Sequence, residues 1–130
     1  MTSMINPTIA ALLDEPQVAA LGTVRPDGTP QVNPMWYERD GDTIRFTHTS
    51  QRAKYRNLLA NPAMTLMVTY PGDAYRYVEL RGVLKEVIED PEGAFYVRLA
   101  ERYGEAEPKP PADKADRVIL VMSISKVIDG

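Results

Sequence analysis

"LGTVRPDGTPQVNPMWYERDGDTIRFTHTSQRAKYRNLLANPAMTLMV", residues 21–68, is the stretch that decides the fold. Apolar runs alternate in it with short turn signals, because RPDG at residues 25–28 and DG at residues 40–41 have the residue types that reverse the chain. Strands joined by such short turns pair antiparallel. The stretch therefore predicts a helix preceded by three antiparallel strands, at residues 18–24, 30–38 and 43–48.

The rest of the chain extends this pattern on both sides. Asn6-Pro7 predicts a first helix, and Asp90-Pro91 predicts a third helix that Gly104 ends. Gly82 is expected to form a bulge or bend in a long strand. Three further strands are predicted at residues 63–70, 75–89 and 117–127. We therefore expect a mainly β (α+β) fold, a six-stranded antiparallel closed or split β-barrel with short helices outside.

The composition narrows the classes of function. The 130 residues predict a single domain, 1–130, and the net charge of -3 disfavours nucleic acid as a partner. The chain has no cysteine and one histidine, so no metal site of those ligands is expected. Residues 1–16 show no signal-peptide pattern, and every apolar run is shorter than the ~20 residues of a membrane helix. We expect a cytoplasmic protein without a membrane partner.

Basic residues gather where the second helix is predicted to begin, in THTSQRAKYRNLLANP (Thr47–Pro62). With Ser50 as the N-cap, Arg52 and Lys54 fall close to the positive end of the helix dipole, which repels cations and binds anions. Such a local conflict often marks function. The residues leave two readings open, a solvated surface face and a seat for phosphate. The expected apolar face, from which Lys54 points away, consists of Tyr55, Leu58 and Leu59.

Three other features carry candidate chemistry. Pro34 inside VNPMWY predicts a bulge or a break in pairing, and the alternative is an edge strand with a core tryptophan. His48 is placed beside a phosphate or a ring rather than in catalysis. The alternation in DAYRYVEL predicts a polar-aromatic face that faces solvent, a ligand or a second subunit. No catalytic triad, glycine-rich phosphate loop or carboxylate pair is legible.

The order and spacing of three motifs resemble one known family. P-D-G-x-P-Q-V at residues 26–32, R-A-K-x-R-N-L at 52–58 and Y-V-E-L-R-G at 77–82 are similar to the pyridoxamine 5′-phosphate oxidase-like split-barrel superfamily. The resemblance is strongest to the F420-dependent branch, the flavin/deazaflavin oxidoreductases of group B. It implies an FMN-binding type of split barrel and a homodimer with cofactor sites between the subunits.

The resemblance also implies the residues of the cofactor site. Arg52 and Lys54 would hold the phosphate, with Ser50 and Ala53 contributing backbone N–H groups. Gln31, Val32, Asn33 and Pro34 would border the ring, and Thr47, His48 and Thr49 would lie beside it. Tyr75 and Tyr77 would come from the other subunit.

The implied reaction is hydride transfer from reduced coenzyme F420 to a small unsaturated organic substrate. The cofactor then carries the chemistry, and no side chain is assigned a catalytic role, with Tyr37, Tyr77 and water left open as proton donors. The closing VMSISKVIDG lacks the arginine-rich segment with which true pyridoxamine phosphate oxidases hold their substrate. The alternatives are an FMN-dependent oxidase or reductase on the same fold and a non-catalytic F420- or flavin-binding protein.

Overall fold

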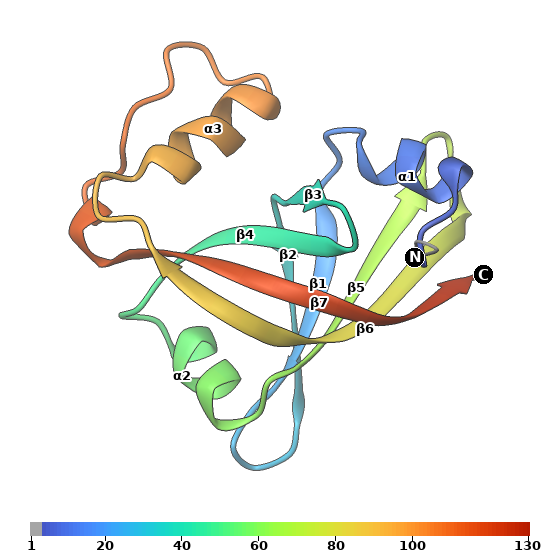
Figure 1. Cartoon of the computed structure of the whole chain (residues 1–130), viewed down its shortest axis with the longest axis horizontal. Helices are drawn as coiled ribbons and strands as arrows, with labels where there is room; N and C mark the ends of the chain where they lie inside the picture. Colours follow the sequence, from blue (N-terminus) through green and yellow to red (C-terminus); the bar gives the residue numbers. More distant parts are fainter. Residues whose placement is uncertain (1–3) are drawn as a thin grey trace.

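The computed structural model describes residues 4–130, so the first three residues of the stretch searched for a signal-peptide pattern, residues 1–16, lie outside the described residues. The described residues form seven strands and three α-helices, with one 3₁₀ helix before the last strand (Figure 1). In chain order the elements are α1 (Pro7–Leu13), β1 (Ala19–Val24), β2 (Pro30–Met35), β3 (Glu38–Asp40), β4 (Thr43–Thr49), α2 (Ala53–Ala60), β5 (Ala63–Tyr70), β6 (Asp73–Glu89), α3 (Ala94–Arg102), the 3₁₀ helix (Lys114–Asp116) and β7 (Arg117–Asp129).

All strand pairs are antiparallel, in the order β2-β1-β5-β6-β7-β4-β3. The sheet curls into two layers, with β1, β2 and β5 behind the crossing β4, β6 and β7 (Figure 1). The space between the layers is filled by apolar side chains such as Phe46, Leu66 and Leu120, each with no exposed area. Because β2 and β3 at the two ends do not pair with each other, the barrel is split rather than closed.

The predicted fold class is confirmed, with seven strands in place of six. The additional strand is β3, Glu38–Asp40, which forms a short hairpin with the beginning of β4. The sequence prediction merged it into a strand ending at residue 38, because ERD is polar and has no apolar alternation. The chain leaves β2 after Met35 and crosses Trp36 and Tyr37 before the hairpin begins.

The predicted bulge at Pro34 is wrong. The register between β1 and β2 runs unbroken from Ala19↔Met35 to Val24↔Pro30. Pro34 is tolerated because β2 is an edge strand, where a missing N–H breaks no ladder. The alternative reading of an edge strand is therefore correct.

The core aromatic residue of this stretch is Tyr37, which has no exposed area. Trp36 is only partly buried and stacks on Tyr103 at 4.9 Å between ring centroids. The irregularity expected at Gly82 is confirmed, because the β6–β7 register shifts between Arg81 and Gly82.

Only the first of the three predicted helix starts is confirmed, because the Asn6 side chain caps α1 by accepting from the N–H of Ile9 at 2.8 Å. The third helix begins later than predicted, at Ala94 with Gly93 at the N-cap position, although the Asp90 carboxylate still accepts from the N–H groups of Ala94 and Phe95. The predicted cap of the second helix is also wrong, because α2 begins at Ala53 with Arg52 at the N-cap position and no side-chain cap.

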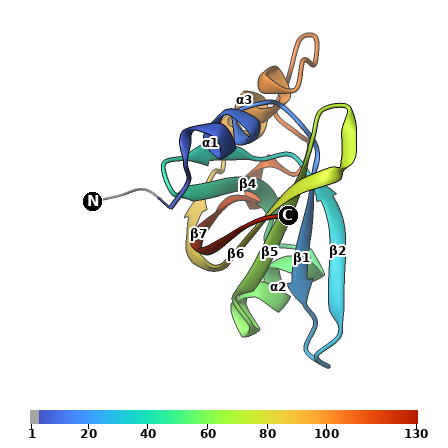
Figure 2. The same ribbon diagram turned by 90° about the vertical axis from the view of Figure 1, so that its right-hand side faces the viewer.

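The helices cover opposite ends of the sheet, with α1 and α3 at one end and α2 at the other (Figure 2). Arg102 of α3 donates to the carbonyls of residues 13, 14 and 15 at the end of α1 and to that of Tyr37. This contact fixes α1, α3 and the end of β2 to one another. No helix among residues 4–130 is long and apolar enough to cross a membrane.

Candidate functional site

The candidate site lies where the two ends of the sheet approach α2. Among the described residues, β2 has no strand partner on the side opposite β1, and β3 pairs with β4 only up to Arg45. The remainder of that β4 edge is open, and the beginning of α2 fills the split. A cavity of about 270 Å³ lies here, lined by Gln31, Asn33, His48, Arg52, Ala53 and Lys54.

Strand alternation explains which side chains reach the cavity. Successive residues of a strand face opposite sides, so Gln31, Asn33 and Met35 of β2 share one face while Val32 and Pro34 share the other. The buried face of α2 is formed by Lys54, Asn57 and Leu58. The predicted apolar face is therefore partly wrong: Leu59 is 58% exposed. The inward face of α2 is therefore partly polar, and its first residues line this cavity.

Lys54 is the most unusual residue of the site. Its side chain is buried, with 7% exposure, although we expected it at the surface. Its Nζ donates to Met35 Sδ at 3.4 Å, a weak acceptor, and forms no ion pair with any described residue. Burial and, second, the nearby Arg52 lower the pKa of Lys54. A cation buried without a carboxylate is costly, which indicates that an anionic ligand completes its surroundings.

His48 supplies a second unsatisfied group. It is 7% exposed, and its Nε2 has no hydrogen-bond partner among the described residues. Burial, followed by the charges of Lys54, Arg52 and Arg117, lowers the pKa of His48 to about 4. The imidazole is therefore neutral near pH 7. Asn33 Oδ1 on the facing strand is also buried without a partner, so the cavity has polar atoms ready for a ligand.

The beginning of α2 adds free donors to the cavity. No side chain caps the helix, so the N–H groups of its first turn lack the usual partner. Ser50, the predicted cap, instead donates both its N–H (3.0 Å) and its hydroxyl (3.3 Å) to the carbonyl of Asp116. The free N–H groups of the first turn of α2, together with Arg52 and Lys54, make this corner of the cavity strongly electropositive.

The structure brings six of the predicted site residues to one cavity and leaves the others apart. Val32 and Pro34 line an adjoining hollow of about 330 Å³ on the outer face of β2. Thr47 and Thr49 flank His48 and, by strand alternation, face the other side of β4. Tyr75, 95% exposed, and Tyr77 belong to the β5–β6 hairpin, which lies away from α2 (Figure 2). Their contribution from a second subunit stays a prediction.

Sequence reasoning missed Met35 as a site residue. It lies two residues after Asn33 on the same face, so alternation from Gln31 onward could have found it. Of the proton donors left open, Tyr37 lies in the core, and burial raises the pKa of its phenol well above the usual range. Its hydroxyl does not reach the cavity. Among residues 4–130, no group of three or more His, Cys, Asp or Glu side chains could hold a metal ion.

Comparisons with known proteins agree with this architecture. Residues 5–129 match the family model described as pyridoxamine 5′-phosphate oxidase, and the chain belongs to this family. An F420 reductase is similar in structure at a TM-score of 0.87, with 52% identity over 91% of this chain and 94% of that chain. No match to a curated protein was found.

Two more distant structures extend the comparison. A conserved hypothetical protein from Mycobacterium tuberculosis has a TM-score of 0.74 and 26% identity, covering 98% of this chain and 82% of that chain. The General Stress Protein 26 from Bacillus anthracis has a TM-score of 0.68 and 19% identity, covering 92% of this chain and 88% of that chain. The latter shows the shared fold alone.

Proposed function

We propose that this protein is an F420-dependent oxidoreductase that transfers a hydride to a small unsaturated organic substrate. The observation that carries the proposal is Lys54, a buried ammonium with no carboxylate partner among the described residues, beside an uncapped helix start. A phosphate is the anion that such a corner fits. The 52% identity to an F420 reductase supports F420 as the molecule that brings it.

The residues of the cavity divide between the phosphate and the ring. Lys54 and Arg52 would hold the phosphate, and Ala53 would add a backbone N–H from the first turn of α2. His48 on β4 and Asn33 on β2 both line the cavity. His48 Nε2 and Asn33 Oδ1 are buried there without a hydrogen-bond partner among the described residues. They would pair with the polar edge of a flat heterocycle lying along β2. The donor and acceptor set therefore suits a phosphate-bearing deazaflavin.

F420, when bound, supplies the hydride, so the protein's part is binding and orientation. The neutral His48 would hydrogen-bond the bound molecule without adding a third positive charge to the two nearby cations. Met35 and the aliphatic part of Lys54 would keep water from the inner side of the cavity. Neither role requires an acid–base pair, which agrees with the lack of one in the sequence.

The proposal includes a homodimer with the sites between subunits. A cavity of about 270 Å³ lies below the range of about 300–1,000 Å³ typical of small-molecule sites, so a single chain would hold only part of the coenzyme. Val32 (67%), Met67 (40%) and Tyr75 (95%) are large apolar or aromatic side chains left exposed. A second copy packed on this surface would cover them and complete the wall, with Tyr75 and Tyr77 as its contribution.

Binding and turnover test the proposal in sequence. Titration of the purified protein into F420 should quench the coenzyme's fluorescence with saturation, and a parallel titration of FMN should give weaker binding. Reduced F420 should then be oxidised when enones or quinones are added. Tight binding of FMN without F420 binding would overturn the choice of coenzyme. Binding of F420 without turnover over a broad panel would indicate a carrier and overturn the enzyme.

A further inference from the structure

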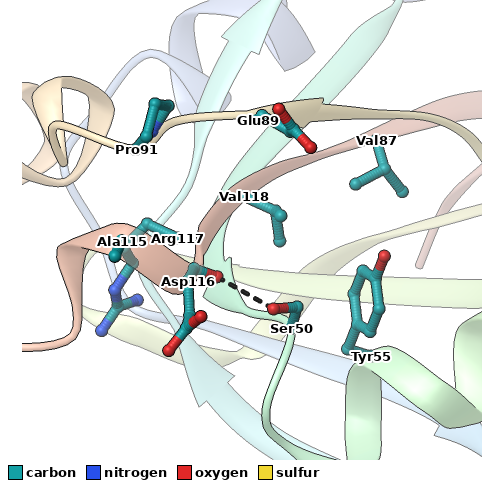
Figure 3. A pocket seen from close by; sticks show the side chains of 9 residues that line it. All are labelled: Ser50, Tyr55, Val87, Glu89, Pro91, Ala115, Asp116, Arg117 and Val118. Carbon is teal, nitrogen blue, oxygen red and sulfur yellow. Dashed lines mark hydrogen bonds between the residues drawn. The ribbon is translucent and has the colours of Figure 1, made fainter.

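A second cavity, of about 440 Å³, lies on the other side of the segment that leads into α2 (Figure 3). Its walls come from four elements: α2, the end of β6, the 3₁₀ helix and the beginning of β7. None of its lining residues belongs to the cavity of His48 and Lys54. Ser50 lines this second cavity, and its hydrogen bonds to the Asp116 carbonyl fix the segment before α2 to the 3₁₀ helix.

The floor of the second cavity is apolar and continuous with the core. Val118 is 6% exposed, and Tyr55 and Val87 pack against the core cluster. Figure 3 shows the Tyr55 ring rising from α2 opposite the β6 residues Val87 and Glu89. A ligand seated here would meet an aromatic ring and two valines on its inner side.

The rim of the second cavity is acidic. Glu89 and Asp116 line it, and neither side chain forms an ion pair with any described residue. The single cation of the rim, Arg117, is already engaged, because it pairs with Asp113 at 3.0 Å and lies 4.9 Å over the Tyr96 ring. Neither carboxylate is therefore neutralised at the rim, and Figure 3 shows the Asp116 carboxylate directed away from Glu89, at the other end of the cavity.

The position of Glu89 breaks the pattern of its strand. Glu89 pairs with Val118, and Val87 pairs with Leu120, so all four side chains share one face of the sheet. Leu120 and Val118 on that face are buried. A carboxylate thus ends β6 on the face that carries Val87, and its side chain is exposed at the rim of the cavity. Departures of this kind from local patterning are expected at functional sites.

We propose that this second cavity binds a small organic cation, an ammonium or amidinium group carried on an apolar or aromatic body. The charged head lies beside Glu89, with Asp116 adding negative charge at the other end of the rim, and the body packs on Tyr55, Val87 and Val118. The Tyr55 ring offers a face to the body or to the cation itself. Unlike the cavity of Lys54, this site has no place for a phosphate, since its unpaired charges are negative.

The test uses 2-phenylethylammonium as the probe and its neutral counterpart 2-phenylethanol as the comparison. Backbone amide NMR spectra of the full chain, recorded without coenzyme, should show saturable shifts at residues 50, 55, 89 and 116–118 with the ammonium probe. The affinity of the alcohol should be at least about tenfold lower, because the alcohol lacks the positive charge that the carboxylates attract. Equal binding of the two probes, or no saturable shift, would overturn the proposal.

Charge-removing variants sharpen the test. The double variant Glu89→Gln/Asp116→Asn should weaken the ammonium probe about tenfold, and it keeps the Asp116 carbonyl that holds Ser50. Glu86→Gln, an exposed carboxylate on the same strand that does not line the cavity, should leave binding unchanged. An equal loss in the Glu86 variant would reduce the effect to general charge and contradict a site.

Lys54→Met separates this proposal from the function proposed above. It should leave binding of the ammonium probe unchanged, because Lys54 does not line the second cavity. A loss of probe binding in this variant would contradict two independent sites.

Discussion

The two cavities beside residues 49–55 have opposite character although they share one short segment. On one side, Lys54 is buried without an ion pair, His48 is buried with an unpaired Nε2, and the available charge is positive. On the other side, Glu89 is exposed and Asp116 is half-buried, and the unpaired charge is negative. The contrast shows that local packing decides the sign of the unpaired charge in each cavity. The net charge of -3 predicts neither of them.

The difference follows from how the backbone of the segment is used. Ser50 donates its N–H and its hydroxyl to Asp116, so its hydrogen-bonding groups are consumed on the acidic side. Three residues later, at Ala53, α2 begins without a side-chain cap, so the N–H groups of its first turn stay available on the basic side. Burial then strengthens the electrostatic interactions of Lys54 and His48, because water screens buried groups less than exposed ones.

The largest expected effect is on the basic cavity alone. Lys54→Met should weaken F420 binding about 100-fold, since a buried charge-assisted contact to phosphate is lost. Lys85→Met, which removes an exposed lysine of β6, is the matched control and should bind F420 like the parent chain. Fluorescence quenching of F420 measures both. Similar affinity in the two variants would mean that Lys54 does not hold the phosphate.

The same variant should be more stable than the parent. The structure buries the Lys54 ammonium without a carboxylate partner among the described residues, so a methionine at this position removes the cost of burying an uncompensated charge. A gain of about 1 kcal/mol would raise the melting temperature by about 3–5 °C in a domain of this size. Thermal unfolding without ligand measures it, and a lower melting temperature would contradict the burial argument.

The next effect is a change in how stability depends on pH. The pKa of His48 is about 4 in the folded chain and close to 6.5 when unfolded. As the pH falls from 6.5 to 4, the unfolded chain takes up a proton that the folded chain refuses, so the folded state loses stability in that window. His48→Gln should lose less stability between pH 7 and pH 4.5. Urea unfolding at both pH values tests this, and identical losses would contradict a buried, neutral His48.

The smallest effect should fall on both cavities together. Ser50→Ala removes the hydroxyl contact to Asp116 and keeps the backbone N–H contact. We expect a loss of about 0.5–1.5 kcal/mol in the free energy of unfolding. Affinity for F420 and for 2-phenylethylammonium should each fall about twofold to threefold, or about 0.5 kcal/mol, because the segment between the cavities loosens. A loss in only one cavity would show that Ser50 does not couple them.

Much of the fold could be predicted, because its signals are local. Turn residues set the ends of β1, β2, β4 and β5 to within a few positions. The strand β3 was not predicted, because its three polar residues show no alternation of apolar and polar side chains. The Pro34 error came from treating β2 as an interior strand, whereas its place at the sheet edge depends on pairing that no local pattern records.

Part of the residue set of the candidate cavity was predicted, but its environment was not. The motif at residues 52–58 pointed to Arg52 and Lys54; Arg52 is exposed, whereas the burial of Lys54 follows from packing across the split sheet. Apolar periodicity suggested Tyr55, Leu58 and Leu59 as the inner face of α2. The observed face contains Lys54 and Asn57, because a helix that lines a polar cavity turns polar residues inward. The hydrogen bonds of Arg102 could not be predicted either, because all their acceptors are backbone carbonyls, which leave no pattern in the sequence.

The most direct test of the central claim, that the basic cavity is a seat for an anion, is an NMR titration of the single histidine. His48 reports on the cavity because the charges of Lys54 and Arg52 help to lower its pKa to about 4. Sulfate, which stays doubly charged throughout the titration, stands in for phosphate, and chloride at equal ionic strength is the reference. The account predicts that sulfate raises the pKa of His48 by about one unit, because it offsets both cations. An identical pKa in sulfate and chloride would contradict it.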